Sequence, residues 1–451
     1  MTRRLKFSVE CLGAALCLPV QREPGCRFRF ADSPQELEDG LSHSYCSDLR
    51  RVSRWAGLLP IALALSAQFV VAQQPGSATD AETAAESNST SPVPSPAAAA
   101  VKGGTPEQLR LAQQQGKADT AVVEWVLANA QIKGDIGAGE LRIAFTITPA
   151  EGWWDKAGGG KLAWHDAPDD NVHLRIFVLD RADGRLVPGL TLRASLIDDN
   201  GNEQSVPADF GWYPLINAYG GNVPIETDSA YTLRVTVDPL QSRHVFGAYG
   251  RFERTITTEF PPVQITQEEV SQLPLATDAA SANEAELLKP CNAAFSAAMT
   301  ALWQQSVSGA EQSSGDYFVG FALDYSGLSK PLASSKFRLK SLIDPTGKDS
   351  VRLALLPRDS RTGRLIPGLK PQTSLVATDG KTYGPGELIL SWHQWLNHYG
   401  RAARIPRKGM YKLLVYFDAP GFRRWGRQSE RFGAPADVEF NNISLKLEAK
   451  D

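Results

Sequence analysis

Histidine is the residue type in this chain best suited to binding a transition metal, because neutral imidazole is a common ligand for copper, iron, nickel and zinc. The 451-residue chain has six histidines. One of them, His43, lies near the N-terminus, and the others are His165, His173, His244, His393 and His398. The elements around these histidines decide which of them can meet.

Patterns of common enzyme sites are absent from the sequence. The chain has no phosphate-binding glycine loop, HExxH, CxxC, nucleophile-elbow GxSxG or EF-hand loop. The basic stretches "RAARIPRK" and "FRR" have no interleaved stacking residues, which argues against a nucleic-acid partner. We therefore expect a protein that is not an enzyme and has no catalytic residues.

A repeat relates the two halves of the chain. The octamer "DGRLVPGL" at residues 183–190 returns as "TGRLIPGL" at residues 362–369. The similarity extends outward in register, and "WYPLINAYG" matches "WHQWLNHYG" at an offset of 180. This offset pairs Trp212 with Trp392 and Asn217 with Asn397. Similarity at a fixed offset is typical of duplication, so we expect two copies of one domain.

Each copy has the sequence pattern of an all-β domain. Short runs such as "VHLRIFVLD" and "YTLRVTVD" are rich in β-branched residues and bounded by Gly, Pro, Asn or Asp. "TPEQLRLAQQQ" has a Thr cap followed by Pro, which predicts a short helix before the first copy. The predicted fold is two tandem immunoglobulin- or cupredoxin-like antiparallel β-sandwiches with short N-terminal helices.

The N-terminal part indicates export. A basic start, an apolar run from Trp55 to about Val71 and small residues at Val70 and Ala72 predict a signal peptide cleaved near Ala72. We expect a periplasmic or secreted protein. The predicted segments are an extension of uncertain status (1–48), the signal peptide (49–72), a low-complexity linker (73–104), copy one (105–260), a second linker (261–290) and copy two (291–451). Cleavage would leave Cys291 as the one cysteine and hence no intrachain disulfide.

The two copies differ in charge. Residues 118–260 contain 12 Lys and Arg against 20 Asp and Glu, whereas residues 291–451 contain 22 against 14. Opposite net charges favour docking of the copies on each other, although a basic copy that binds an anionic partner is equally compatible with the counts.

A family resemblance follows from the order of short motifs: "VHL" on a strand, a loop ending in "HYG", a strand "YTL-V-V" and then a basic "RH". This order resembles the periplasmic iron-transport accessory proteins. The resemblance implies a β-sandwich that binds a divalent metal, copper in particular, and that assists ferrous or ferric iron uptake. It covers about 120 residues in each copy.

The resemblance divides the ligands of that family between the copies. The first family His falls on His173, the His before Tyr-Gly falls on His398, and the third falls on His244. Because those relatives are homodimers with the metal near the subunit interface, we expect an intrachain pseudo-dimer whose metal ligands are His173, His244, His398 and the nearby His393. A copper or iron ion is the expected cofactor.

Arginines occupy three of the remaining family positions, and they oppose metal binding. Arg352 and Arg424 stand where the other copy has His173 and His244, and Arg175 replaces an acidic ligand. Fixed positive charges a few ångströms from a dication cost on the order of several kcal/mol in a partly buried site. The same arginines could instead bind an anion.

Two functions therefore remain open. The first is an exported, non-enzymatic protein that binds a metal or metal complex and assists iron transport, with an inner-membrane iron permease or another envelope protein as partner. The alternative is an envelope module that binds a glycan, polyanion or protein without metal. Its binding residues would lie in aromatic and arginine loops: Arg175, Arg352, Arg424, Trp212, Trp392 and Trp395.

Overall fold

The computed structural model describes residues 105–445, except 158–160, 169–170, 227, 241–242, 246–250, 267, 269–275, 326–349, 394 and 406–407. The predicted N-terminal extension (1–48), signal peptide (49–72) and low-complexity linker (73–104) lie outside the described residues. In the part that is described, no helix is both long and apolar enough to span a membrane.

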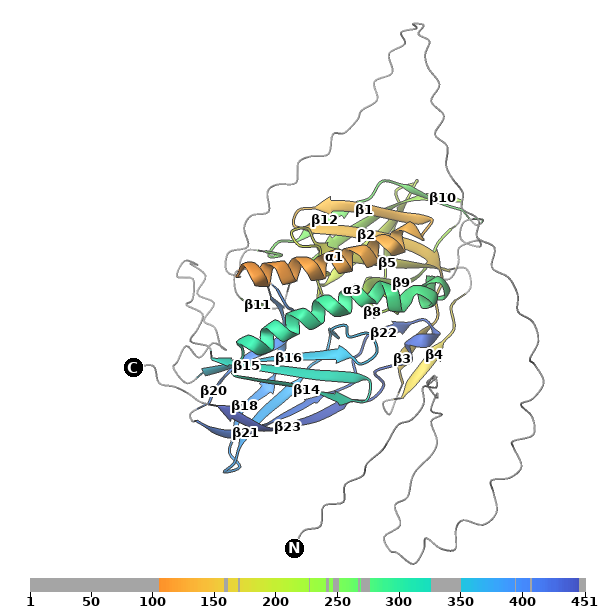
Figure 1. Cartoon of the computed structure of the whole chain (residues 1–451). Helices are drawn as coiled ribbons and strands as arrows, with labels where there is room; N and C mark the ends of the chain where they lie inside the picture. The colour runs from red at the N-terminus through yellow and green to blue at the C-terminus, as the bar shows by residue number, and fades with distance from the viewer. Residues whose placement is uncertain are drawn as a thin grey trace, which may run out of the picture. The chain divides into compact units, whose positions relative to one another are not determined.

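Two helices lie side by side against the sheets, α1 (Pro106–Ala128) and α3 (Ala276–Gln305) (Figure 1). Helix α1 begins with a capping box, in which the Thr105 hydroxyl accepts from the Gln108 amide and the Gln108 side chain accepts from the Thr105 amide. Both helices are longer than the short ones predicted. Residues 276–290 of the predicted second linker belong to α3, because this stretch is rich in the helix formers Ala, Leu and Glu.

The first half of the chain forms an eight-stranded and a five-stranded sheet. The larger sheet has the order β1-β2-β5-β9-β8-β22-β3-β4, and the smaller has β12-β10-β6-β7 with β13 also paired to β10. The strands of this half are β1 (Ile132–Ala138), β2 (Leu141–Pro149), β3 (Trp153–Lys156), β4 (Leu162–His165), β5 (Asn171–Asp180), β6 (Leu192–Asp198), β7 (Glu203–Val206), β8 (Phe210–Trp212), β9 (Ala218–Pro224), β10 (Ser229–Val237), β11 (Arg243–Val245), β12 (Ile256–Glu259) and β13 (Val263–Ile265).

The second half forms a six-stranded sheet, β11-β19-β20-β16-β15-β14, and a four-stranded sheet, β18-β17-β21-β23. Its strands are β14 (Ser308–Ser314), β15 (Tyr317–Tyr325), β16 (Ser350–Asp359), β17 (Gln372–Ala377), β18 (Thr382–Glu387), β19 (Ile389–His393), β20 (His398–Arg404), β21 (Gly409–Phe417), β22 (Arg423–Trp425) and β23 (Ala436–Leu445), with a short 3-10 helix η3 (Arg427–Ser429) after β22. The prediction of all-β sandwiches is confirmed.

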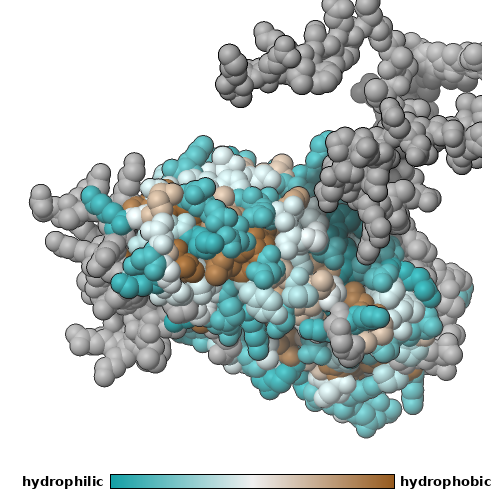
Figure 2. Space-filling view, turned by 90° about the horizontal axis from the view of Figure 1, so that it is seen from below, coloured by the Kyte–Doolittle hydropathy of each residue, from teal (hydrophilic) through white to brown (hydrophobic). Residues whose placement is uncertain are grey.

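Each sandwich has its own apolar core between its two sheets. Strand β5 is buried from Val172 to Asp180, because one face of its sheet covers the core and the other lies under α1, where Val122 and Val123 pack with Phe177. This double burial explains why the run at residues 176–179 is apolar on both faces of the strand. On the face shown in Figure 2, hydrophobic residues reach the surface in small areas surrounded by hydrophilic ones.

The two sandwiches exchange strands. Strand β22 of the second half pairs in parallel with β8 of the first, and β11 of the first half pairs in parallel with β19 of the second. Tryptophans cross with these strands: Trp392 packs in the core of the first sandwich, and Trp212 packs in the core of the second. Each core is therefore completed by residues from the other half.

Candidate functional site

His173 lies at the centre of the eight-stranded sheet with both ring nitrogens hydrogen-bonded. Its Nδ1 is 2.8 Å from Asn222 Oδ1, and its Nε2 is 2.9 Å from the Tyr213 hydroxyl. Asn222 Nδ2 donates to the Glu151 carbonyl, so Asn222 Oδ1 accepts the proton of His173 Nδ1 and the Tyr213 hydroxyl donates to Nε2. The imidazole is thus neutral, and a metal could reach it only by displacing one of these partners.

Burial explains the charge state of this histidine. The ring is 0% exposed, and the Trp425 ring lies edge-on with its centroid 4.3 Å from the His173 centroid. Loss of hydration lowers the pKa of His173 to about 4, with a smaller contribution in the same direction from Arg175. Arg175 is itself neutralised by an ion pair with the buried Glu151.

His393 and His398 lie together where β19 turns into β20. Their ring centroids are 5.2 Å apart, and the planes are tilted by 54°. A metal bound at about 2.0–2.1 Å from each nitrogen would lie about 3.2 Å from each ring centroid, so two ligands at a tetrahedral angle would have centroids about 5 Å apart. The spacing of this pair therefore fits two imidazoles on one ion.

The tautomer of His398 also suits a metal ligand. Its Nδ1 is 3.0 Å from the Leu396 carbonyl, which can only accept, so Nδ1 carries the proton and Nε2 keeps its lone pair. A backbone carbonyl that orients a ligating imidazole in this way is usual around metals. Gly400 leaves room at Nε2, because a Cβ there would lie 3.2 Å from that nitrogen.

Both imidazoles of this pair are neutral at physiological pH. Burial lowers the pKa of His398, and the nearby Arg352 lowers it further. The pKa of His393 lies well below its usual range, first because of burial and then because of His398, Arg185 and Arg352. Neutral rings can donate a lone pair to a metal, but the same arginines repel a cation.

The four predicted metal ligands thus fall into two places. His393 and His398 are adjacent, and β11 brings the backbone of His244 beside them, in register with Trp392. His173 lies on another sheet, within reach of Tyr213 and Trp425 instead. Among the side chains that the structure describes, no three His, Cys, Asp or Glu residues are grouped so as to hold a metal ion.

Comparison with known proteins gives weak structural likenesses. No family model matches the sequence, and no curated protein matches it. A DUF4426 family protein from Pseudomonas aeruginosa is 13% identical, with 30% of this chain and 94% of that chain covered and a TM-score of 0.22. FetP of uropathogenic Escherichia coli strain F11, recombinantly expressed in the periplasm, is 18% identical, with 31% and 96% covered and a TM-score of 0.23.

A copper-bound variant of Campylobacter jejuni P19 is also similar in part. It is 14% identical, covers 31% of this chain and 99% of that chain, and has a TM-score of 0.21. Each of these chains matches less than a third of the present one. Identities and scores this low assign neither a family nor a function to it.

The tryptophans of the alternative binding surface are buried, which corrects their interpretation as exposed loop residues. Trp212, Trp392 and Trp395 are 2%, 2% and 3% exposed. Trp212 and Trp392 fill the exchanged core positions, and Trp395 packs against Leu111 of α1. In the sequence, a large aromatic residue near glycines looks the same whether it fills the core or stacks on a ligand.

The arginines proposed for that surface already interact with other groups of the protein. Arg175 pairs with Glu151, and Arg424 is 0% exposed. The Arg424 guanidinium donates at 2.6–3.0 Å to four backbone carbonyls, those of Pro420, Phe422, Arg431 and Phe432. Arg352 is half-buried beside His398. A guanidinium bound by carbonyls stabilises a loop and has no free edge for a polyanion.

Proposed function

We propose that this chain is an exported, non-enzymatic protein that binds a divalent transition-metal ion at His393 and His398. The observation that carries the proposal is the adjacent pair of neutral imidazoles, with His398 held by the Leu396 carbonyl and open at Nε2. Imidazole nitrogens suit copper and ferrous iron, and copper binds such ligands more tightly. A bound copper is also named for the P19 variant that is similar in part.

His244, the third ligand implied by the resemblance, lies in register with Trp392, and because successive strand residues alternate between faces this position is on the opposite face of the sheet from His393. His173 is left out, because Asn222 and Tyr213 occupy its nitrogens. Two imidazoles leave positions open for water or for a ligand already on the metal, so the site suits a metal complex as well as a bare ion. This openness would suit transfer to an iron permease in the envelope, the partner implied by the family resemblance.

Calorimetric titration of Cu(II), and of Mn(II) in place of ferrous iron, tests the metal site. We expect His393→Ala and His398→Ala to weaken Cu(II) binding on the order of 100-fold, because losing a ligand costs more than losing a group that only orients one. His165→Ala is the matched control, since His165 is exposed on β4 and outside the proposed site.

Circular dichroism would show that the variants keep their fold. Stoichiometric copper binding that survives both His393→Ala and His398→Ala would contradict the proposal. Uptake of radiolabelled iron by cells that carry His398→Ala as their one copy would test the transport role separately. If these cells took up iron as fast as cells with the unaltered protein, iron transport would not require this site.

A further inference from the structure

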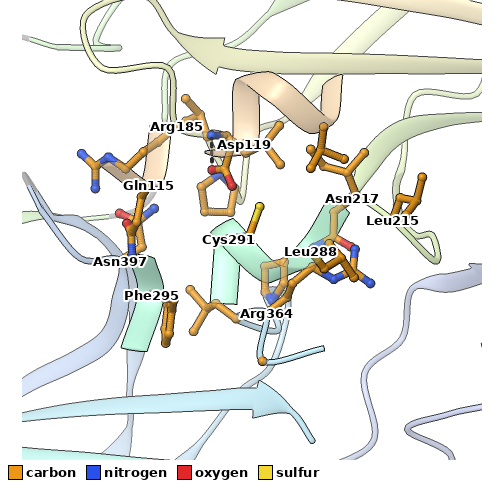
Figure 3. Close-up of a pocket in the computed structure, with 18 of the residues that line it drawn as sticks. Gln115, Asp119, Arg185, Leu215, Asn217, Leu288, Cys291, Phe295, Arg364 and Asn397 are labelled. Carbon is orange, nitrogen blue, oxygen red and sulfur yellow. Dashed lines mark hydrogen bonds between the residues drawn. The ribbon is translucent and has the colours of Figure 1, made fainter. Parts of the chain in front are cut away.

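A cavity of about 130 Å³ lies between the two helices and the two repeated octamers (Figure 3). The loop at residues 183–190 contributes Arg185 to its wall, and the loop at residues 362–369 contributes Arg364. Most of the wall is apolar, from both helices, from the first octamer and from the segment after β8: Val122, Leu186, Leu215, Ile216, Leu288 and Phe295. An apolar cavity with a few polar groups is the usual form of a small-molecule site.

The octamer loops reach this position by close contact with α1. Gly184 has φ +83°, and the Gly116 position on α1 meets the Asp183 carbonyl, with which any Cβ would collide. Glycine is therefore required at both points for the loop to lie against the helix. This contact fixes the arginine that follows Gly184 at the cavity wall.

Three polar groups of the wall lack partners. Gln115 Nε2, Asn217 Oδ1 and Arg364 Nη1 are buried atoms with no hydrogen bond to any described residue. Gln115 is only 9% exposed. Buried donors and acceptors without partners are rare in folded proteins, because each costs about 1–3 kcal/mol. Two donors and one acceptor in one small cavity indicate that a polar molecule satisfies them.

The two arginines differ in their counter-ions. Arg185 pairs with Asp183 at 2.8 Å. The residue that corresponds to Asp183 in the second octamer is Thr362, and Arg364 has no carboxylate within ion-pair distance among the described residues. Instead, Arg364 donates to Thr362 Oγ1 at 3.2 Å and to the Tyr213 carbonyl at 2.8 Å, and it lies over the Trp212 ring.

The remaining acid of the wall does not replace the missing counter-ion. Asp119 accepts a hydrogen bond from the Leu186 amide at 3.2 Å. Burial raises the pKa of Asp119 to about 7, so near neutral pH a large part of it is protonated. Burial also lowers the pKa of Arg364 to about 10, which leaves it charged. The Arg364 guanidinium is therefore charged, and although Asp359 and Glu284 favour this charge from a distance, both acids are paired with other arginines.

We propose that this cavity binds a small monocarboxylate with a short apolar chain. Its carboxylate meets Arg364, its chain lies against Leu186, Leu215 and Leu288, and the Gln115 amide donates to a carboxylate oxygen. A dry cavity of about 150 Å³ accommodates benzene, so about six non-hydrogen atoms is the expected ligand size, as in butanoate. A hydroxyl on the chain would satisfy Asn217 Oδ1, and a hydroxy acid of the same size should bind more tightly.

Titration of the whole chain with butanoate, followed by the fluorescence of the tryptophans, tests the proposal. Trp212 lies 4.2 Å below Arg364, so a carboxylate at this arginine should change its emission. We expect saturable binding of butanoate and stronger binding of lactate, but none of butylammonium, which has an apolar chain of similar length and the opposite charge. Binding of chloride as tight as that of butanoate, or no saturable binding, would overturn the proposal.

Exchange of the counter-ion residues gives a sharper test. Thr362→Asp supplies Arg364 with the partner that Arg185 already has, and should weaken butanoate binding at least 10-fold. The first octamer already tolerates this arrangement, with Asp183 close to Asp180. Gln115→Leu, which leaves the ion pairs intact, should weaken binding by a smaller factor. Unchanged affinity in both folded variants would exclude this cavity as the binding site.

Discussion

Two places in the molecule are built from corresponding positions, 179 or 180 residues apart, and have opposite properties. Around His173, the imidazole is closed by Tyr213 and Asn222. At the corresponding place in the second sandwich, Arg352 replaces His173, and His393 replaces Tyr213. Around His173 the polar groups are hydrogen-bonded to one another, whereas around His398 the Nε2 atom keeps its lone pair. The same strand framework thus supports either a fixed core network or a candidate ligand site.

The exchanged tryptophans test whether the two halves depend equally on each other. Trp392→Ala and Trp212→Ala should each lower the free energy of unfolding by about 3–5 kcal/mol, because each leaves a cavity in the other sandwich. Chemical denaturation measures the loss. Trp154→Ala, at a half-buried position on β3, is the control and should cost less. A small effect at one exchanged position would show that this core tolerates the loss of its partner.

The buried His173 should make the stability of the protein depend on pH in the acid range. The pKa of His173 is about 4 in the folded chain and near 6.5 in the unfolded chain. Between pH 6.5 and pH 4 the unfolded chain therefore binds a proton at this residue that the folded chain does not bind. The free energy of unfolding should therefore fall by about 2–3 kcal/mol from pH 6.5 to pH 4 through this residue. The stability difference between the protein and His173→Gln should narrow over that range. A constant difference would mean that His173 titrates normally.

Asp119 should show the opposite pH dependence. Its folded pKa is about 7 and its unfolded value 3.8, so the folded state holds a proton that the unfolded state has lost, and stability falls as pH rises toward 7. Asp119→Asn keeps an acceptor for the Leu186 amide and removes the charge, so it should stabilise the protein at pH 8 by about 1–2 kcal/mol. The gain should vanish below pH 4. Equal stability at both pH values would contradict this account.

The smallest expected effect concerns the arginine beside the histidine pair. Arg352→Gln removes a positive charge and should strengthen Cu(II) binding by about threefold. Arg352→His adds an imidazole at the position that corresponds to His173, and should strengthen binding by about tenfold. Calorimetry compares the two variants. Equal affinities would mean that the new imidazole does not reach the ion.

Sequence predicted the strands and the all-β fold, because alternation and turn residues are local signals. It did not predict that α3 begins at residue 276. Residues 261–290 were interpreted as a linker although their second half is rich in helix-forming residues. It could not show that Trp212 and Trp392 each pack in the core of the other half. When two copies have similar strands, the sequence does not say in which sheet a given strand pairs.

The candidate site was predicted in part. His393 and His398 are close in sequence and meet in the structure. His173 was grouped with them by resemblance, but its hydrogen bonds depend on Asn222 and Tyr213, which are 49 and 40 residues away. Only the folded chain shows that these partners occupy its nitrogens. The unpartnered atoms Gln115 Nε2 and Arg364 Nη1 likewise had no signal in the sequence.

The strand exchange has a consequence for the order of folding. The eight-stranded sheet begins near residue 132 but takes in β22, which ends at Trp425, so it is complete only when almost the whole chain is available. Contacts so distant in sequence slow folding and leave strand edges exposed in the meantime. The first half alone therefore cannot complete the eight-stranded sheet. Pairing of β22 with β8 and β3 is the step that completes it.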